Sequence, residues 1–254
     1  MAVPVTATYL GTATVLLRIG DLTVLTDPAL DRAPSDYPAA RPLRRTAGAA
    51  LGAEDLPPID LVLLSHDQHA DNLDRAGREV LGRAGRVLTT PEAAERLGGA
   101  AAGLATWESV RCTAGATTVT VTATPARHGP AGTEPVTGPV TGFVVEYEGG
   151  TLYISGDTTR HDALREIGER FTVDTAFLHL GDAHFPATGD LAFSLSAAEG
   201  AELARTLGAR QVVPLHFESW EHFVEDPARI AEAFAAPDLA GRLRMLPPGS
   251  AEAL

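Results

Sequence analysis

The segment SHDQHADNLD, residues 65–74, constrains the fold more than any other part of the chain, because it follows an apolar run directly. That run, IDLVLL at residues 59–64, comes after two prolines and has the length and composition of a short buried strand. The polar segment therefore begins where a strand ends. It brings two imidazoles and three carboxylates to one edge of a predicted sheet.

Three other strand-like runs end in the same way. His128 follows the alternating run 118–124, Asp157 follows the run 151–155, and His216 follows the run 211–215. A single His or Asp at a strand end is more often a hydrogen-bonding or turn residue than a metal ligand. Four such ends in one chain favour a shared edge that binds a metal, and His together with Asp suits zinc, manganese or iron.

Strand-rich and helix-rich segments alternate twice along the chain. Strands are predicted at residues 3–9, 14–19, 22–26, 59–64, 118–124, 140–147, 151–155, 173–178 and 211–215, and helices at 71–83, 196–207 and 227–234. Ser196 and Glu199 have the spacing of a capping box, and Gly208 follows the same helix. This order predicts two α/β halves that pack sheet on sheet with helices outside.

Five motifs in order resemble the metallo-β-lactamase superfamily, and within it the lactonase-like branch of ascorbate-6-phosphate lactonase and the N-acyl-phosphatidylethanolamine phospholipases. The motifs are GTATVLLRIGDLTVLTDP, SHDQHADNLD, ARHGP, SGDT and PLHFE. The resemblance covers nearly the whole chain. It implies an αββα four-layer sandwich of two mixed β-sheets with helices on the outer faces, formed by residues 1–254 as a single domain.

The resemblance also implies a set of ligands for one or two divalent ions, zinc foremost, with manganese or iron as alternatives. His66, His69 and His128 would hold one ion, Asp157 would bridge, and Asp71 with His216 would hold a second. Asp71 would orient or deprotonate the attacking water, so that Asp71 and His69 are the candidate catalytic residues.

The first motif departs from the family pattern H-x-H-x-D-H. Aligned from His66, the second His position holds Gln68; aligned from Asp71, it holds His69. An imidazole is the stronger zinc donor, which favours His69 and leaves Gln68 as the alternative. Asn72 stands where the family has its third His. The second site is therefore expected to be weaker, and occupancy by one ion is a hypothesis.

Composition excludes or disfavours several classes of function. All 20 basic residues are arginine, which excludes Schiff-base catalysis and a P-loop lysine. The net charge of −13 disfavours a nucleic acid as partner. The single Cys112 fits a reducing compartment, and neither a signal peptide nor a membrane-spanning segment is evident. A cytoplasmic protein without integral membrane association is expected, and its oligomeric state stays open.

The predicted function is metal-dependent hydrolysis of a small ester, lactone, amide or phosphodiester by a metal-activated water. Two alternatives remain. One is a recast metal site that binds a metabolite or performs non-hydrolytic chemistry, motivated by Gln68 and Asn72. The other, less favoured, is a nuclease of the same superfamily.

Several residues outside the motifs have two interpretations. The segment 28–58 is predicted to be a long irregular loop, either solvated or walling a substrate cavity with Arg41, Arg44 and Arg45. His179 and His184 either line the sheet edge or pack as ordinary polar residues. We expect Asp27 to fix a loop, and the remaining two histidines, His161 and His222, to lie in a first helical turn and in a local cap or packing contact.

Overall fold

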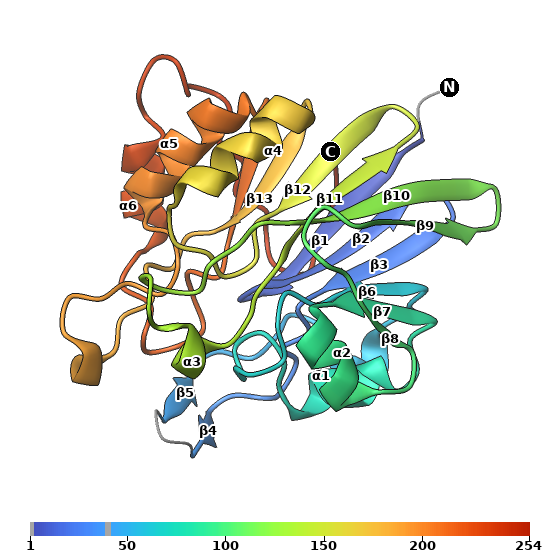
Figure 1. The fold of residues 1–254 in the computed structure, drawn as a ribbon, viewed down its shortest axis with the longest axis horizontal. Helices are drawn as coiled ribbons and strands as arrows, with labels where there is room; N and C mark the ends of the chain where they lie inside the picture. Colours follow the sequence, from blue (N-terminus) through green and yellow to red (C-terminus); the bar gives the residue numbers. More distant parts are fainter. Residues whose placement is uncertain (1–2, 39–41) are drawn as a thin grey trace.

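Two mixed β-sheets pack face to face in the computed structural model, which describes residues 3–38 and 42–254 (Figure 1). The first sheet has the strand order β15 (Ala251–Ala253), β1 (Val5–Gly11), β2 (Thr14–Ile19), β3 (Leu22–Thr26), β6 (Leu61–Leu63), β7 (Arg86–Thr89) and β8 (Ala101–Gly103). Strands β15 to β3 pair antiparallel, and β3, β6, β7 and β8 pair parallel.

The second sheet repeats this mixture of directions. Its order is β14 (Gln211–Leu215), β13 (Thr175–His179), β12 (Gly150–Ile154), β11 (Gly142–Tyr147), β10 (Thr117–Thr124) and β9 (Ser109–Ala114). Strands β14, β13 and β12 are parallel, and β12 to β9 are antiparallel. Each sheet therefore has one parallel half and one antiparallel half.

Three apolar clusters define four layers. The central cluster lies between the sheets and joins side chains such as Leu17 and Val24 of the first to Val121 and Phe177 of the second. A second cluster packs α4 (Arg165–Arg170), α5 (Ala197–Leu207) and α6 (Pro227–Ala233) on the outer face of the second sheet. A third packs α1 (Arg75–Leu81) on the first sheet, and α2 (Pro91–Leu97) lies beside β7 and β8. The predicted αββα sandwich is confirmed.

The carboxyl ends of six strands meet at one edge. β3 and β6 run parallel in the first sheet, and β12, β13 and β14 run parallel in the second. β10 runs in the direction of β12, because β11 pairs antiparallel with both. Loops that follow these strands therefore leave the sandwich on the same side, and this arrangement positions the site described below.

Local structure differs from the predictions in a few places. Residues 71–74 form turns, and α1 begins after Asp74, whose side chain accepts a hydrogen bond from the Gly77 N–H as the helix cap. The segment 28–58 is not wholly irregular, since it carries the hairpin β4 (Ser35–Tyr37) and β5 (Leu43–Arg45) and a 3-10 turn, η1 (Ala53–Asp55). Short elements such as α3 (Glu134–Thr137) were not predicted. Within the described ranges, no helix combines the length and apolarity needed to cross a membrane.

Candidate metal centre

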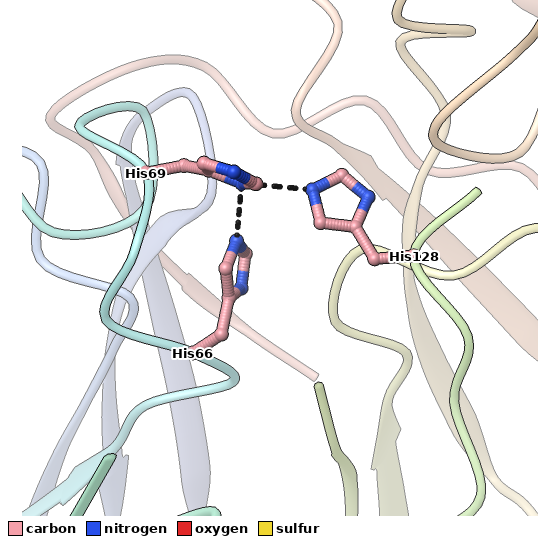
Figure 2. Close-up of side chains that lie close together, drawn as sticks. All are labelled: His66, His69 and His128. Carbon is pink, nitrogen blue, oxygen red and sulfur yellow. Dashed lines mark hydrogen bonds between the residues drawn. The ribbon is translucent and has the colours of Figure 1, made fainter. Parts of the chain in front are cut away.

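Three histidines from two loops point their rings at one another (Figure 2). His66 and His69 come from the loop after β6, and His128 comes from the loop after β10. The His69 Nδ1 atom lies 3.0 Å from His66 Nε2 and 2.9 Å from His128 Nε2. We call His66, His69 and His128 the histidine trio.

Outer hydrogen bonds orient two rings of the histidine trio. His128 Nδ1 lies 2.6 Å from the Phe193 carbonyl oxygen, which can only accept, so Nδ1 carries the proton and donates. The Nε2 atom of a neutral His128 ring therefore presents a lone pair to His69. His66 Nδ1 pairs with Ser65 Oγ at 2.9 Å. His69 Nδ1 carries at most one proton and can donate it to only one of the two Nε2 atoms that face it. At least one imidazole lone pair therefore points at the centre of the trio without a donor.

Asp157 lies between the histidine trio and a second group of ligand-type side chains. Its Oδ2 is 3.9 Å from His66 Nε2 and 3.8 Å from His128 Nε2. Its Oδ1 is 3.2 Å from His216 Nδ1 and 2.8 Å from His179 Nδ1. One carboxylate therefore faces both groups, with a separate oxygen for each.

The second group centres on Asp71. Its Oδ2 accepts a hydrogen bond from His222 Nε2 at 2.9 Å and lies 3.2 Å from His216 Nε2. His216 follows β14 and adopts a φ of 58°, a strained value for a residue other than glycine. This left-handed turn directs the imidazole back across the strand ends.

Burial sets the charge of these groups. It lowers the pKa of His66 and of His128 well below the usual imidazole value, and the nearby His69 lowers both further. Burial also lowers the pKa of His69. Burial alone would raise the pKa of Asp71, but the adjacent imidazoles of His216 and His222 outweigh it and hold that pKa well below its usual range. The trio is therefore neutral and the Asp71 carboxylate is ionised.

This donor set fits a divalent cation. Two ligands at about 2.1 Å from a tetrahedral ion lie about 3.4 Å apart, close to the spacing within the histidine trio. Several buried polar atoms of the centre have no hydrogen-bond partner, among them Asp71 Oδ1 and both ring nitrogens of His216. Buried lone pairs without donors are costly in a protein interior. A cation at the trio would accept the lone pairs of its three imidazoles, and a second cation beside Asp71 would accept a lone pair from that carboxylate and from one nitrogen of His216.

The six residues predicted as ligands all come together here: His66, His69, Asp71, His128, Asp157 and His216. His69 faces the centre, whereas the Gln68 side-chain oxygen accepts a hydrogen bond from the Asp67 N–H. Sequence analysis missed the contact between His222 and Asp71. It left the role of His179 open, and the structure places this ring against Asp157 and 3.9 Å from Asp27 Oδ2.

The structure also shows where other residues with predicted roles lie. Asp27 holds the loop after β6, since its Oδ1 accepts the Ser65 N–H at 2.7 Å. His161 precedes a 3-10 turn, η2 (Asp162–Leu164). The expectation that the arginines of segment 28–58 meet a substrate is wrong for Arg45, which is fully buried against Asp74 at 2.9 Å. Arg41 lies outside the described residues.

Two neighbouring cavities lie at the centre. A small one, about 50 Å³, is lined by residues that include His69, Asp71, His128 and Asp157. A larger one, about 810 Å³, is walled by the β4–β5 hairpin, the segment around Phe185 and the segment around His222. Leu43, Phe185 and His222 line both.

The larger cavity is mainly apolar. Tyr37, Leu43, Phe185 and Val224 contribute aromatic and aliphatic surface. Arg44 also lines it, but the guanidinium is paired with Glu221 at 3.4 Å and lies 4.0 Å from Asp36. Among the described residues that line this cavity, the positive charge of Arg44 is therefore balanced by neighbouring carboxylates.

Comparison with known sequences gives a family match over most of the chain. Residues 23–217 match the family model described as the beta-lactamase superfamily domain. A UPF0173 metal-dependent hydrolase from Exiguobacterium is 27% identical over 230 residues, 89% of this chain and 90% of that protein. Others are matched over only about half of their length: a protein of the same name from Geobacillus thermodenitrificans is 32% identical over 114 residues, 45% of this chain and 41% of that protein. One from Pelotomaculum thermopropionicum is 31% identical over 137 residues, 52% of this chain and 55% of that protein.

Solved structures share the fold at low sequence identity. A possible metal-dependent hydrolase from Veillonella parvula has a TM-score of 0.84 at 18% identity, and the match covers 98% of this chain and 99% of that one. An isothiocyanate hydrolase from Delia radicum gut bacteria has a TM-score of 0.82 at 22% identity, with the same coverage. CmlA, a diiron β-hydroxylase from Streptomyces venezuelae, has a TM-score of 0.71 at 18% identity, and the match covers 98% of this chain and 54% of that one.

Proposed function

The chain belongs to the beta-lactamase superfamily domain family, and from this premise we propose that it is a metal-dependent hydrolase of small, neutral, largely apolar substrates. The observation that carries the proposal is the convergence of the histidine trio on one point, with Asp157 beside it and a cavity in front. Relatives over nearly the full chain are named metal-dependent hydrolases, which supports the same class of reaction.

His66, His69, His128 and Asp157 would hold the ion. A divalent ion bound there lowers the pKa of water to about 7 and polarises the bond under attack, so no protein nucleophile is required. Zinc suits three imidazoles and a carboxylate, with manganese or iron as alternatives. The solved diiron neighbour adds weight to iron.

Asp71 would orient the attacking water or accept its proton. Its carboxylate lines the small cavity, and Oδ1 has no hydrogen-bond partner. The neighbouring imidazoles of His216 and His222 keep the pKa of Asp71 low, so it stays an acceptor near neutral pH. An ionised carboxylate at this position orients a water molecule toward a substrate in the adjoining cavity.

The larger cavity selects for neutral, apolar molecules. Tyr37, Leu43 and Phe185 offer apolar contact, and the charge of Arg44 is taken up by Glu221 and Asp36. A phosphodiester would meet the carboxylates without an unpaired cation among the described lining residues. Carboxylic esters, lactones and amides are therefore the favoured substrates. The lactonase-like assignment belongs to this proposal.

The test combines metal analysis with a substrate panel. The panel holds aryl esters, lactones, acyl amides, phosphodiesters and, because of the solved neighbour's name, an arylalkyl isothiocyanate. We expect turnover of a neutral carbonyl substrate, and His128→Ala to lose both metal and at least about 100-fold in kcat/KM. His161→Ala, in a different cavity, is the control. Full metal content and full turnover in His128→Ala would exclude the proposal.

A further inference from the structure

We propose that His222 takes the place of the third histidine of the family pattern, where this chain has Asn72, and completes a second metal site with Asp71 and His216, beside Asp157. This inference rests on the proposed function, because it assigns a second ion to the same centre. It reverses the expectation that the second site is weak. The family pattern places its third histidine beside the Asp of the first motif, at position 72 of this sequence; His222 comes from a segment 150 positions further along the chain.

The geometry around Asp71 is that of a ligand group. His222 Nε2 and His216 Nε2 lie 2.9 Å and 3.2 Å from the same carboxylate oxygen, Oδ2. Three ligand-type atoms from two loops, the one after β6 and the one after β14, therefore meet at one place. Asp157 Oδ1 approaches the His216 ring from its other side at 3.2 Å. Asp157 Oδ2 faces the histidine trio, so this carboxylate lies between both groups.

Burial without hydrogen bonding points to a cation at this place. The side chains of Asp71, His216 and His222 are at most 7% exposed. Asp71 Oδ1, both ring nitrogens of His216 and His222 Nδ1 have no hydrogen-bond partner. A purely structural His–Asp pair would leave these atoms unsatisfied in the interior. A divalent ion between these side chains would accept one lone pair from each imidazole and one from the Asp71 carboxylate, and its charge would offset that of the carboxylates.

Ring contacts and a backbone hydrogen bond fix the position of His222. Its ring stacks on Phe185 at 5.1 Å with an interplanar angle of 17° and touches the Phe223 ring at 4.4 Å. The backbone carbonyl of His222 accepts the His184 N–H at 3.0 Å. Strained left-handed turns at His216 and Ser219 bring this segment back over the strand ends. Preorganisation of this kind is typical of ligands.

The experiment measures zinc content and affinity. Wild type, His222→Asn and the control His161→Asn are stripped with chelator, reloaded with zinc chloride and desalted, and bound zinc is counted per chain. We expect two ions in wild type and in the control, and one in His222→Asn. The second zinc should weaken by more than the roughly 100-fold that loss of an outer hydrogen-bonding partner can cost. Cobalt(II) titration reads the same sites by visible absorption, independent of activity.

The outcomes separate this inference from the proposed function. Two retained ions in His222→Asn, or a weakening within roughly 100-fold, overturn the role of His222 as ligand and leave the hydrolase proposal standing. One ion in wild type overturns the second site alone. No bound zinc or cobalt in wild type overturns both. His222→Gln, compared with wild type by thermal unfolding of the metal-free proteins, separates ligand loss from misfolding.

Discussion

At the scale of single residues, the most consequential side chain outside the metal centre is Arg45. It is fully buried and donates hydrogen bonds to Asp74 Oδ2, the Ala29 carbonyl and the Ala47 carbonyl, each at 2.8–2.9 Å. Asp74 in turn caps α1. This ion pair ties the β4–β5 hairpin, which walls the cavity, to the loop that carries the first ligands.

Arg45→Met should destabilise the protein by about 3–5 kcal/mol, because it leaves the buried Asp74 carboxylate without its partner. The measurement is the free energy of unfolding in urea. Arg205→Met, which breaks an exposed pair with Asp238, should leave that free energy nearly unchanged. Equal losses in both variants would contradict the importance given to burial.

Much of the candidate site could be predicted residue by residue, since each of the His and Asp residues that follow predicted strands reaches the same edge. His222 could not, because it follows no strand. Its position depends on left-handed turns at His216 and Ser219. A histidine or a serine in the sequence does not predict that backbone conformation. Choosing His69 over Gln68 needed only donor strength, whereas the contact between His179 and Asp157 depends on the parallel register of β12 and β13.

At the scale of elements, α1 packs closely on the loop after β3. A Cβ at Gly77 would collide with the Pro28 carbonyl oxygen, whereas a Cβ at Gly82, at the end of the same helix, would meet only the Glu79 carbonyl oxygen at 3.4 Å. Gly77 also donates its N–H to the Asp74 cap. The helix therefore requires a residue without a side chain at its first contact.

Gly77→Ala should cost about 1–3 kcal/mol through this overpacking. Gly82→Ala is the matched control; its φ of −64° accepts alanine, and stability should stay or rise by up to about 1 kcal/mol. Thermal unfolding of both variants measures the difference. A Gly77→Ala protein as stable as the Gly82→Ala protein would show that α1 can move away from Pro28.

Ser196→Ala should lower the free energy of unfolding by about 1 kcal/mol, because the Ser196 hydroxyl accepts the Glu199 N–H and caps α5. This corresponds to a fall of about 2–4 °C in Tm for a chain of this size. Thr206→Ala, exposed on the same helix, is the comparison. An unchanged Tm for Ser196→Ala would mean that packing alone holds α5.

Long periodic elements were predictable and short ones were not. β2, β3 and β14 have the predicted bounds, and α5 has its predicted cap and final glycine. β7 and β8 were missed because runs of four and three residues carry no clear periodicity; pairing of β7 with β6, and of β8 with β7, decides their structure. The helix α2, with seven residues, was also missed. β15 forms only because β1 offers it an edge.

At the scale of the whole molecule, the proposed metal links the two sheets. His66, His69 and Asp71 follow β6 of the first sheet, whereas His128, Asp157 and His216 follow β10, β12 and β14 of the second. Chelation should therefore lower Tm, because free metal at 100 times its Kd stabilises the folded state by about 2.7 kcal/mol and this stabilisation falls with the logarithm of the free metal concentration.

Calorimetry with and without chelator, on wild type and on Asp157→Ala, measures this stabilisation. The variant should respond much less than wild type. A wild-type Tm that is indifferent to both chelator and added zinc would contradict a structural contribution from the metal.

The division of donors between the sheets has a consequence for biogenesis. In a nascent or half-assembled chain, each sheet carries only part of the set of metal ligands. A partial set competes poorly with cellular chelators for a scarce ion. Tight binding of the proposed ion would therefore require that the two sheets have already packed together.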